Sequence, residues 1–104
     1  MISGLDEYQA KAAKFAVYLD PHYPYYGLME EVGELMSLRA KELRGDKADY
    51  SRERIQKELG DILWNLALIA YDKGYGLSEI ADINLAKLDS RLARGEIRGE
   101  GDER

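Results

Sequence analysis

The chain has 104 residues, with 15 lysines and arginines against 20 aspartates and glutamates, and a formal net charge of −5. This length supports one domain with one hydrophobic core. The absence of cysteine excludes disulfides, zinc–thiolate sites and thiol catalysis. The acidic excess argues against a nucleic-acid polymer as partner, because binding to a phosphate backbone needs basic patches.

The sequence shows no targeting signal or membrane span, and we therefore expect a cytoplasmic protein. Residues 1–7 lack the basic and apolar regions of a signal peptide. No apolar run approaches the roughly 20 residues that a membrane-spanning helix needs. We therefore expect no contact with a membrane.

Apolar periodicity predicts a first helix before the prolines of the chain. Its stripe recurs every three or four residues and comprises Leu5, Tyr8, Ala12, Phe15 and Leu19. The two prolines, Pro21 and Pro24, are expected to interrupt helical structure as far as Gly27.

Three further helices are predicted after this interruption. The second spans residues 28–44, and the third starts near Ser51 and runs to about Asp72. The third helix is apolar over a wide arc, which predicts that it is the most buried. Ser78 is the expected N-cap of the fourth helix, which stops at Gly95. The sequence thus predicts a single all-α domain over residues 1–104, with 95–104 as a glycine-rich tail.

Two helical segments carry the same order of acidic, apolar and glycine residues. They are Glu31-Val32-Gly33-Glu34-Leu35 and Glu58-Leu59-Gly60-Asp61-Ile62. At about 100° per residue, both acids of each segment lie beside the apolar stripe of their helix. Four carboxylates that face a core are unfavourable unless a cation neutralises them.

The predicted ligands therefore favour a hard metal ion. Oxygen donors without histidine or cysteine select Mg²⁺ or Mn²⁺. The alternative is that Glu31, Glu34, Glu58 and Asp61 are solvated surface acids. A ferritin-like di-iron centre is improbable, because it needs Glu-x-x-His pairs and His22 is the single histidine.

Three other residues near the acids suggest contacts with a neighbouring element. Gly33 and Gly60 lie opposite their acids, which predicts close approach of another helix or subunit, with a merely tolerated glycine as the alternative. Trp64 points away from the carboxylates of its own helix, and we expect it at an interface.

The ordered set of motifs resembles the MazG-like all-α nucleoside triphosphate pyrophosphohydrolases. The match comprises the two acid pairs, segments 27–34, 58–64, 84–88 and 91–95, and the closing segment 99–104. The resemblance implies a four-helix bundle assembled as a homodimer or homotetramer (a dimer or a dimer of dimers), with sites between helices of more than one subunit. It also implies Mg²⁺-dependent hydrolysis of a (deoxy)nucleoside triphosphate to its monophosphate and pyrophosphate, with Mn²⁺ as a possible substitute. Glu31, Glu34, Glu58 and Asp61 take the family's metal-ligand and catalytic positions.

Candidate substrate-binding residues follow from the same resemblance and from spacing. Asn84 and Lys87 match positions on the last helix that face the site and hold metal or phosphate. They share one helix face with Arg91 one turn beyond, an amide and two cations suited to a polyphosphate, unless this face is simply solvated. Tyr26 is the candidate for stacking on a base, with core or interface packing as the alternative.

Two other functions compete with this prediction. One is a non-catalytic helical module that binds nucleotide or a partner protein, although such a module has no need of all four acids. The other is a relative that acts on phosphoribosyl-ATP, which the last helix and the tail fit less well. The preferred base and sugar are not identified by the sequence.

Overall fold

A computed structural model describes residues 1–18 and 20–95 of the chain, and its regular structure is helical. The helices are α1 (Leu5–Ala13), α2 (Tyr23–Arg44), α3 (Arg52–Lys73) and α4 (Leu77–Ala93). No strand occurs in these residues, which confirms the predicted all-α class. The predicted tail beyond Gly95 lies outside the described residues.

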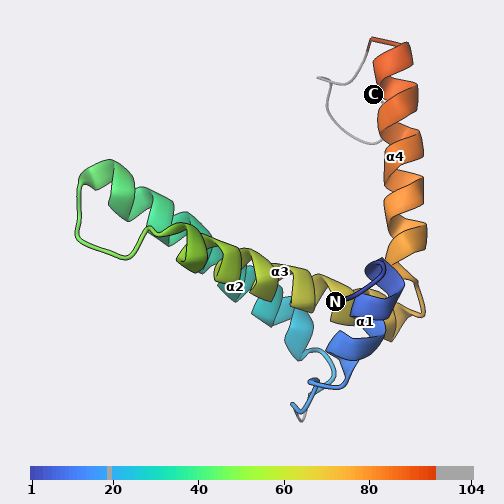
Figure 1. Cartoon of the computed structure of the whole chain (residues 1–104), viewed down its shortest axis with the longest axis horizontal. Coiled ribbons are helices and arrows are strands. Elements are labelled where there is room, and N and C mark those ends of the chain that lie inside the picture. Colours follow the sequence, from blue (N-terminus) through green and yellow to red (C-terminus); the bar gives the residue numbers. More distant parts are fainter. Residues whose placement is uncertain (19, 96–104) are drawn as a thin grey trace.

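The two long helices α2 and α3 form a hairpin, which is one arm of the molecule in Figure 1. Gly45 ends α2 with a φ of 79°, a left-handed conformation that glycine adopts without a steric penalty. Ser51 caps α3, because its hydroxyl oxygen accepts a hydrogen bond from the Arg54 backbone N–H at 3.2 Å. The predicted start of the third helix is therefore confirmed.

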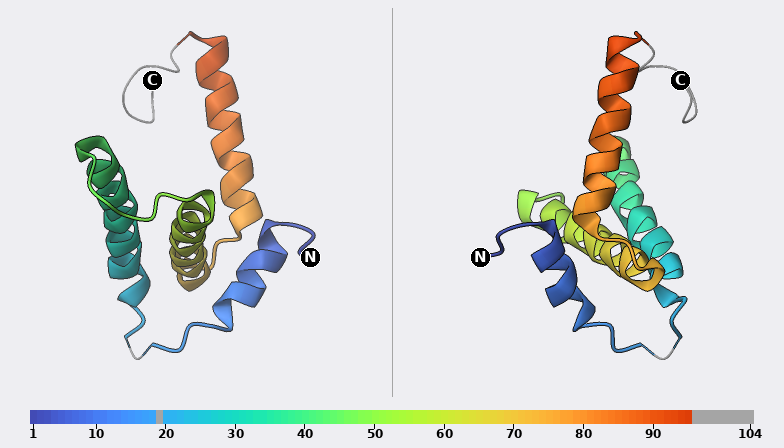
Figure 2. Two further views of the ribbon diagram at one scale, coloured as in Figure 1. Left: turned by 60° about the vertical axis from the view of Figure 1, so that its left-hand side comes forward. Right: turned by 90° about the vertical axis from the view of Figure 1, so that its right-hand side faces the viewer.

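Helix α4 is a second arm that leaves the hairpin at an angle. It packs mainly on α1, and α1 in turn packs on α3. The left view of Figure 2 shows α4 rising apart from α2. Gln9 of α1 links α3 to the turn before α4. Its side-chain amide donates to Ala67 O at 3.2 Å and to Tyr75 O at 3.0 Å.

The buried core of the single chain is small and consists largely of alanine. Its main cluster contains Ala12, Ala67, Ala70 and Leu77, with Tyr8 and Trp64 packed against it. Because α3 supplies more buried residues than any other helix, the expectation that it is the most buried is confirmed.

Trp64 packs inside the chain, whereas the sequence analysis expected it at an interface. Its indole N–H donates a hydrogen bond to Ala12 O at 3.0 Å, and its ring packs against the core cluster. The side chain therefore joins α1 to α3 within the chain. Angular position relative to the acids could not reveal this contact, because α1 covers the other side of α3.

Two helix boundaries near the prolines also differ from the prediction. Helix α2 begins at Tyr23 rather than Leu28, because Pro24 lies in the first turn, where its missing N–H needs no partner. Helix α1 ends at Ala13, and Phe15 is exposed beyond it. The last member of its predicted stripe, Leu19, lies outside the described residues.

The start of α4 is capped by α1 instead of by Ser78. The Leu77 N–H donates to Gln9 Oε1 at 3.2 Å, and the Ser78 N–H donates to Asp6 Oδ1 at 3.0 Å. Side chains from a distant helix thus satisfy the first N–H groups, so that the predicted N-cap is wrong.

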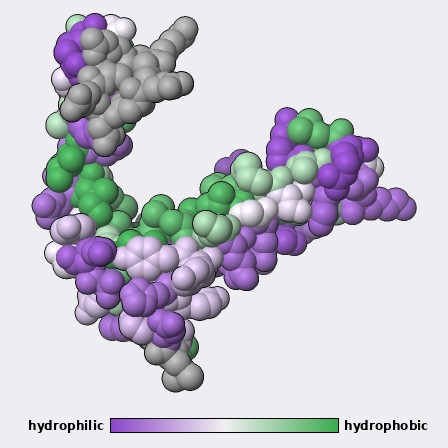
Figure 3. Space-filling view, turned by 180° about the vertical axis from the view of Figure 1, so that it is seen from behind, coloured by the Kyte–Doolittle hydropathy of each residue, from purple (hydrophilic) through white to green (hydrophobic). Residues whose placement is uncertain are grey.

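Many large apolar side chains remain exposed on the single chain. Figure 3 shows them gathered along the inner side of the angle between α4 and the hairpin. Exposed examples are Leu59, Leu63 and Leu66 on α3 and Ile80 and Ile83 on α4. None of the helices in the described part of the chain is long and apolar enough to cross a membrane.

Candidate active site

Three of the four predicted acids meet where α2 and α3 pack together. Glu31 and Glu34 lie one turn apart on α2, and Glu58 lies on α3. Each offers a carboxylate oxygen, and these oxygens lie within 4.8 Å of one another. Glu58 is only 5% exposed, Glu31 is half-buried and Glu34 is exposed. The cluster therefore opens to solvent on one side and is closed by the helices on the other.

Two oxygens of this cluster are buried without a hydrogen-bond donor. They are Glu31 Oε2 and Glu58 Oε2. A buried carboxylate oxygen without a donor is energetically unfavourable, and a bound cation would remove this penalty for both. An oxygen-only donor set fits a hard divalent ion such as Mg²⁺ or Mn²⁺. The residues present therefore fit the predicted metal.

The electrostatics of the cluster agree with this fit. Burial is the main cause that raises the pKa of Glu31 from 4.5 to about 7, and the proximity of the Glu58 carboxylate and the charges of Asp61 and Glu34 add to it. The Glu31 carboxyl thus keeps its proton to a higher pH than an ordinary glutamate does, and a divalent cation would compete with that proton.

The fourth predicted ligand, Asp61, lies at the edge of the cluster. It is exposed, one turn beyond Glu58 on α3, and does not belong to the group of converging oxygens. Its charge nevertheless acts on Glu31. Its role as a ligand stays a prediction.

Asn65 is a buried polar residue two turns beyond Glu58 on α3 that the sequence analysis did not select. It is 3% exposed, its amide donates to Asp61 O at 2.9 Å, and its Oδ1 is buried without a donor. The backbone of Gly27 lies against it, since a Cβ built on that glycine would be 2.5 Å from Asn65 Oδ1. The signal in the sequence was its place on the same side of α3 as Glu58 and Asp61.

The predicted substrate residues of α4 lie apart from the acids in the single chain. Asn84 is exposed, Lys87 is half-buried and Arg91 is buried, all on the arm that packs on α1. Because α4 does not run along the hairpin, the structure does not bring them to Glu31 and Glu58 within one chain (Figure 1).

Tyr26 lies in the first turns of α2 and is 72% exposed. It lines a surface hollow together with His22, Tyr25, Asp72 and Lys73. An exposed ring at this position is available for stacking, and its predicted contact with a base remains a prediction.

The two glycines of the acid motifs have no close neighbour in the chain. No atom lies within 4 Å of a Cβ built on Gly33 or Gly60. Approach of another helix of the described chain is therefore excluded as the reason for these glycines. Approach of a second subunit stays a prediction.

Comparison with known proteins identifies the family of the chain. Residues 22–94 match the family model for the MazG nucleotide pyrophosphohydrolase domain. The "Gene 37 protein" of Mycobacterium phage L5 is 36% identical over 112 aligned positions, which cover 96% of this chain and 98% of that protein. No solved structure matches the chain significantly. The matched segment contains both acid pairs and all of α2, α3 and α4, and we conclude that the chain belongs to the MazG nucleotide pyrophosphohydrolase family.

Proposed function

We propose that the protein is a Mg²⁺-dependent pyrophosphohydrolase that converts a (deoxy)nucleoside triphosphate to its monophosphate and pyrophosphate. The observation that carries this proposal is the convergence of Glu31, Glu34 and Glu58, with two buried oxygens that lack a donor. Such a set could hold a metal ion, which would supply positive charge for a polyphosphate. Mn²⁺ is the expected substitute, since it prefers the same oxygen ligands.

In this proposal, the carboxylates position the metal and the substrate relative to each other. Glu31, Glu34, Glu58 and Asp61 would hold Mg²⁺, which on binding neutralises charge, orients the triphosphate and lowers the pKa of a water. Glu58 is fixed by burial, whereas Glu34 at the solvent side can adjust to the substrate. Tyr26 would stack on the base.

We further propose that the active form is a homodimer or homotetramer. The single chain leaves large apolar side chains of α3 and α4 exposed, among them Leu63, Leu66 and Ile83. A gathered apolar surface of this kind is typical of a face that a partner covers. A second copy seated in the angle between α4 and the hairpin would cover the apolar surface seen in Figure 3. It would also supply Asn84, Lys87 and Arg91 to the acids of the first copy.

Pyrophosphate release tests the activity. The wild-type protein is assayed with Mg²⁺ against the eight common ribo- and deoxyribonucleoside triphosphates, which also identifies the preferred base and sugar. We expect Glu34→Gln and Asp61→Asn to abolish turnover, while the exposed Glu53→Gln on α3 retains it. Full activity of both site variants would refute the assignment of these residues.

Binding and sizing experiments separate the competing functions. Calorimetry that shows tight nucleotide binding without turnover would favour a non-catalytic module. Turnover of phosphoribosyl-ATP but of no nucleoside triphosphate would favour the second alternative. Light scattering after size-exclusion chromatography gives the oligomeric state, and a monomer at micromolar concentration would refute the proposed assembly.

A further inference from the structure

An arginine contacts the acid cluster from the solvent side. Arg54 lies one turn before Glu58 on α3, and its Nε–H donates to Glu58 Oε1 at 3.1 Å. The Glu58 side chain is 7% exposed, whereas the Arg54 side chain is 39% exposed. The acid therefore lies inside the cluster and the cation lies at its opening.

The two oxygens of Glu58 differ in their surroundings. Oε1 is held by Arg54, whereas Oε2 is buried and has no donor. The Arg54 contact therefore leaves one Glu58 oxygen available to a metal. A guanidinium in this position does not block the predicted metal site.

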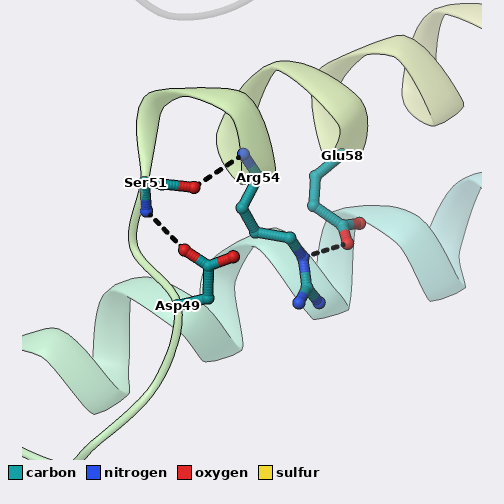
Figure 4. Close-up of polar contacts among 4 residues, drawn as sticks. All are labelled: Asp49, Ser51, Arg54 and Glu58. Atoms are coloured by element: carbon teal, nitrogen blue, oxygen red, sulfur yellow. Dashed lines mark hydrogen bonds and ion pairs between the residues drawn. The ribbon is translucent and has the colours of Figure 1, made fainter.

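The backbone around Arg54 is fixed by its own hydrogen bonds. Its N–H donates to Ser51 Oγ at 3.2 Å, and the Ser51 N–H donates to Asp49 Oδ1 at 2.9 Å. Figure 4 shows this chain of contacts, which runs from Asp49 through Ser51 and Arg54 to Glu58. The guanidinium thus extends from a capped first turn rather than from a frayed helix end.

Most of the donors of this guanidinium are not used by the protein. Its two terminal nitrogens extend beyond the Glu58 contact (Figure 4), and no hydrogen bond joins them to any of the described residues. A guanidinium has five N–H donors, and its pair of terminal nitrogens matches the spacing of two phosphate oxygens. The arginine can hold Glu58 and an anion at the same time.

We propose that Arg54 is a substrate-binding residue that contacts a phosphate oxygen of the triphosphate, and of pyrophosphate after cleavage. Its Nε stays on Glu58 while the terminal nitrogens bind the anion. A polyphosphate at this cluster needs cations besides the metal, because the nearby carboxylates repel it. The inference rests on the proposed function only in that the ligand contains a pyrophosphate group.

The simpler role for Arg54 is to stabilise Glu58, and the two roles predict different binding data. Isothermal titration calorimetry measures two ligands: Mn²⁺ alone, and inorganic pyrophosphate in the presence of saturating Mn²⁺. The variants are Arg54→Gln and Arg54→Lys, and the control is Arg52→Gln, an exposed charge in the same turn of α3. Circular dichroism verifies that each variant keeps its helices.

For Arg54→Gln, we expect pyrophosphate to bind about 10- to 100-fold more weakly, the range for losing a charged hydrogen bond. Mn²⁺ alone should bind at least as tightly as in the wild type, because a cation has been removed from beside the site. Arg54→Lys should be intermediate, since an ammonium keeps the charge but not the paired donors. Unchanged pyrophosphate binding, or an equal loss of Mn²⁺ binding, would overturn the proposal.

These measurements do not depend on turnover. If the wild type binds pyrophosphate through Arg54 but hydrolyses no triphosphate, the proposed function fails and the inference stands. If the wild type hydrolyses triphosphates and Arg54→Gln binds pyrophosphate normally, the inference fails and the proposed function stands.

Discussion

Replacement of Glu31 by glutamine tests whether the metal-free cluster destabilises the fold at neutral pH. Burial is the main cause that raises the Glu31 pKa from 4.5 to about 7. Because one pKa unit corresponds to about 1.4 kcal/mol, a shift of this size amounts to roughly 3 kcal/mol once the carboxylate is ionised. Solvent at this half-buried position screens part of the effect, so we expect about 1–2 kcal/mol.

The direction in which stability changes with pH follows from the direction of the pKa shift. The folded chain binds the Glu31 proton more tightly than the unfolded chain does. The stabilising contribution of this group is therefore fully present below pH 4.5. It declines as the pH rises and is lost above about pH 7. Glu31→Gln cannot ionise and should therefore be more stable than the wild type at pH 8, with little difference at pH 5.

Urea unfolding at both pH values, in EDTA and at one protein concentration, measures this difference. Added Mg²⁺ should stabilise the wild type at pH 8 and have little effect on Glu31→Gln, because a neutral amide is a weak ligand. The control is Glu30→Gln, which changes an exposed acid next to the site. Equal stability of Glu31→Gln and the wild type at pH 8 would refute the argument from burial.

Three further substitutions test the packing around the site. Gly27→Ala should destabilise the chain by about 1–3 kcal/mol, because the new Cβ would lie 2.5 Å from Asn65 Oδ1; an unchanged Tm would contradict this close approach. Trp64→Phe removes the hydrogen bond to Ala12 O and should lower stability by about 1–2 kcal/mol, measured by urea unfolding, whereas equal stability would show that the bond contributes nothing. Leu63→Asp on the exposed face of α3 should shift the oligomer toward monomer in light scattering, and an unchanged mass would place the interface elsewhere.

Local signals in the sequence predicted the helices and failed where distant segments meet. Ser51 marks the start of α3 through its hydroxyl, and Gly45 marks the end of α2 through its left-handed backbone, so these boundaries could be read from residue type. Ser78 has the chemistry of an N-cap, but Asp6 and Gln9 of α1 satisfy the first N–H groups of α4. A cap supplied by a residue about seventy positions away leaves no local pattern.

In the candidate site, too, local features were predictable from the sequence and contacts between distant segments were not. Glu31, Glu34 and Glu58 were predictable because helical spacing places acids beside the apolar stripe of each helix, and the structure brings their oxygens together. The position of α4 was not predictable, because the amphipathic pattern says that a helix is covered but not by which element. Apolar side chains recur at helical spacing on α4, but several of them, such as Ile83, are exposed in this chain.

The charge balance of the chain connects these observations. Without the four motif acids, 16 acidic side chains remain against 15 basic ones, so nearly all of the net negative charge belongs to this cluster. An anionic nucleotide would be repelled by the cluster alone, and Arg54 offsets only one of the charges at its opening. A divalent cation held by these acids would reverse this repulsion, because it would satisfy the buried oxygens and present positive charge to the phosphates. Under the proposed function, metal and nucleotide would therefore strengthen each other's binding by the same factor, since coupling between two ligands is reciprocal. The acidity that disfavours a nucleic-acid polymer is thus compatible with a small nucleotide that arrives together with its metal.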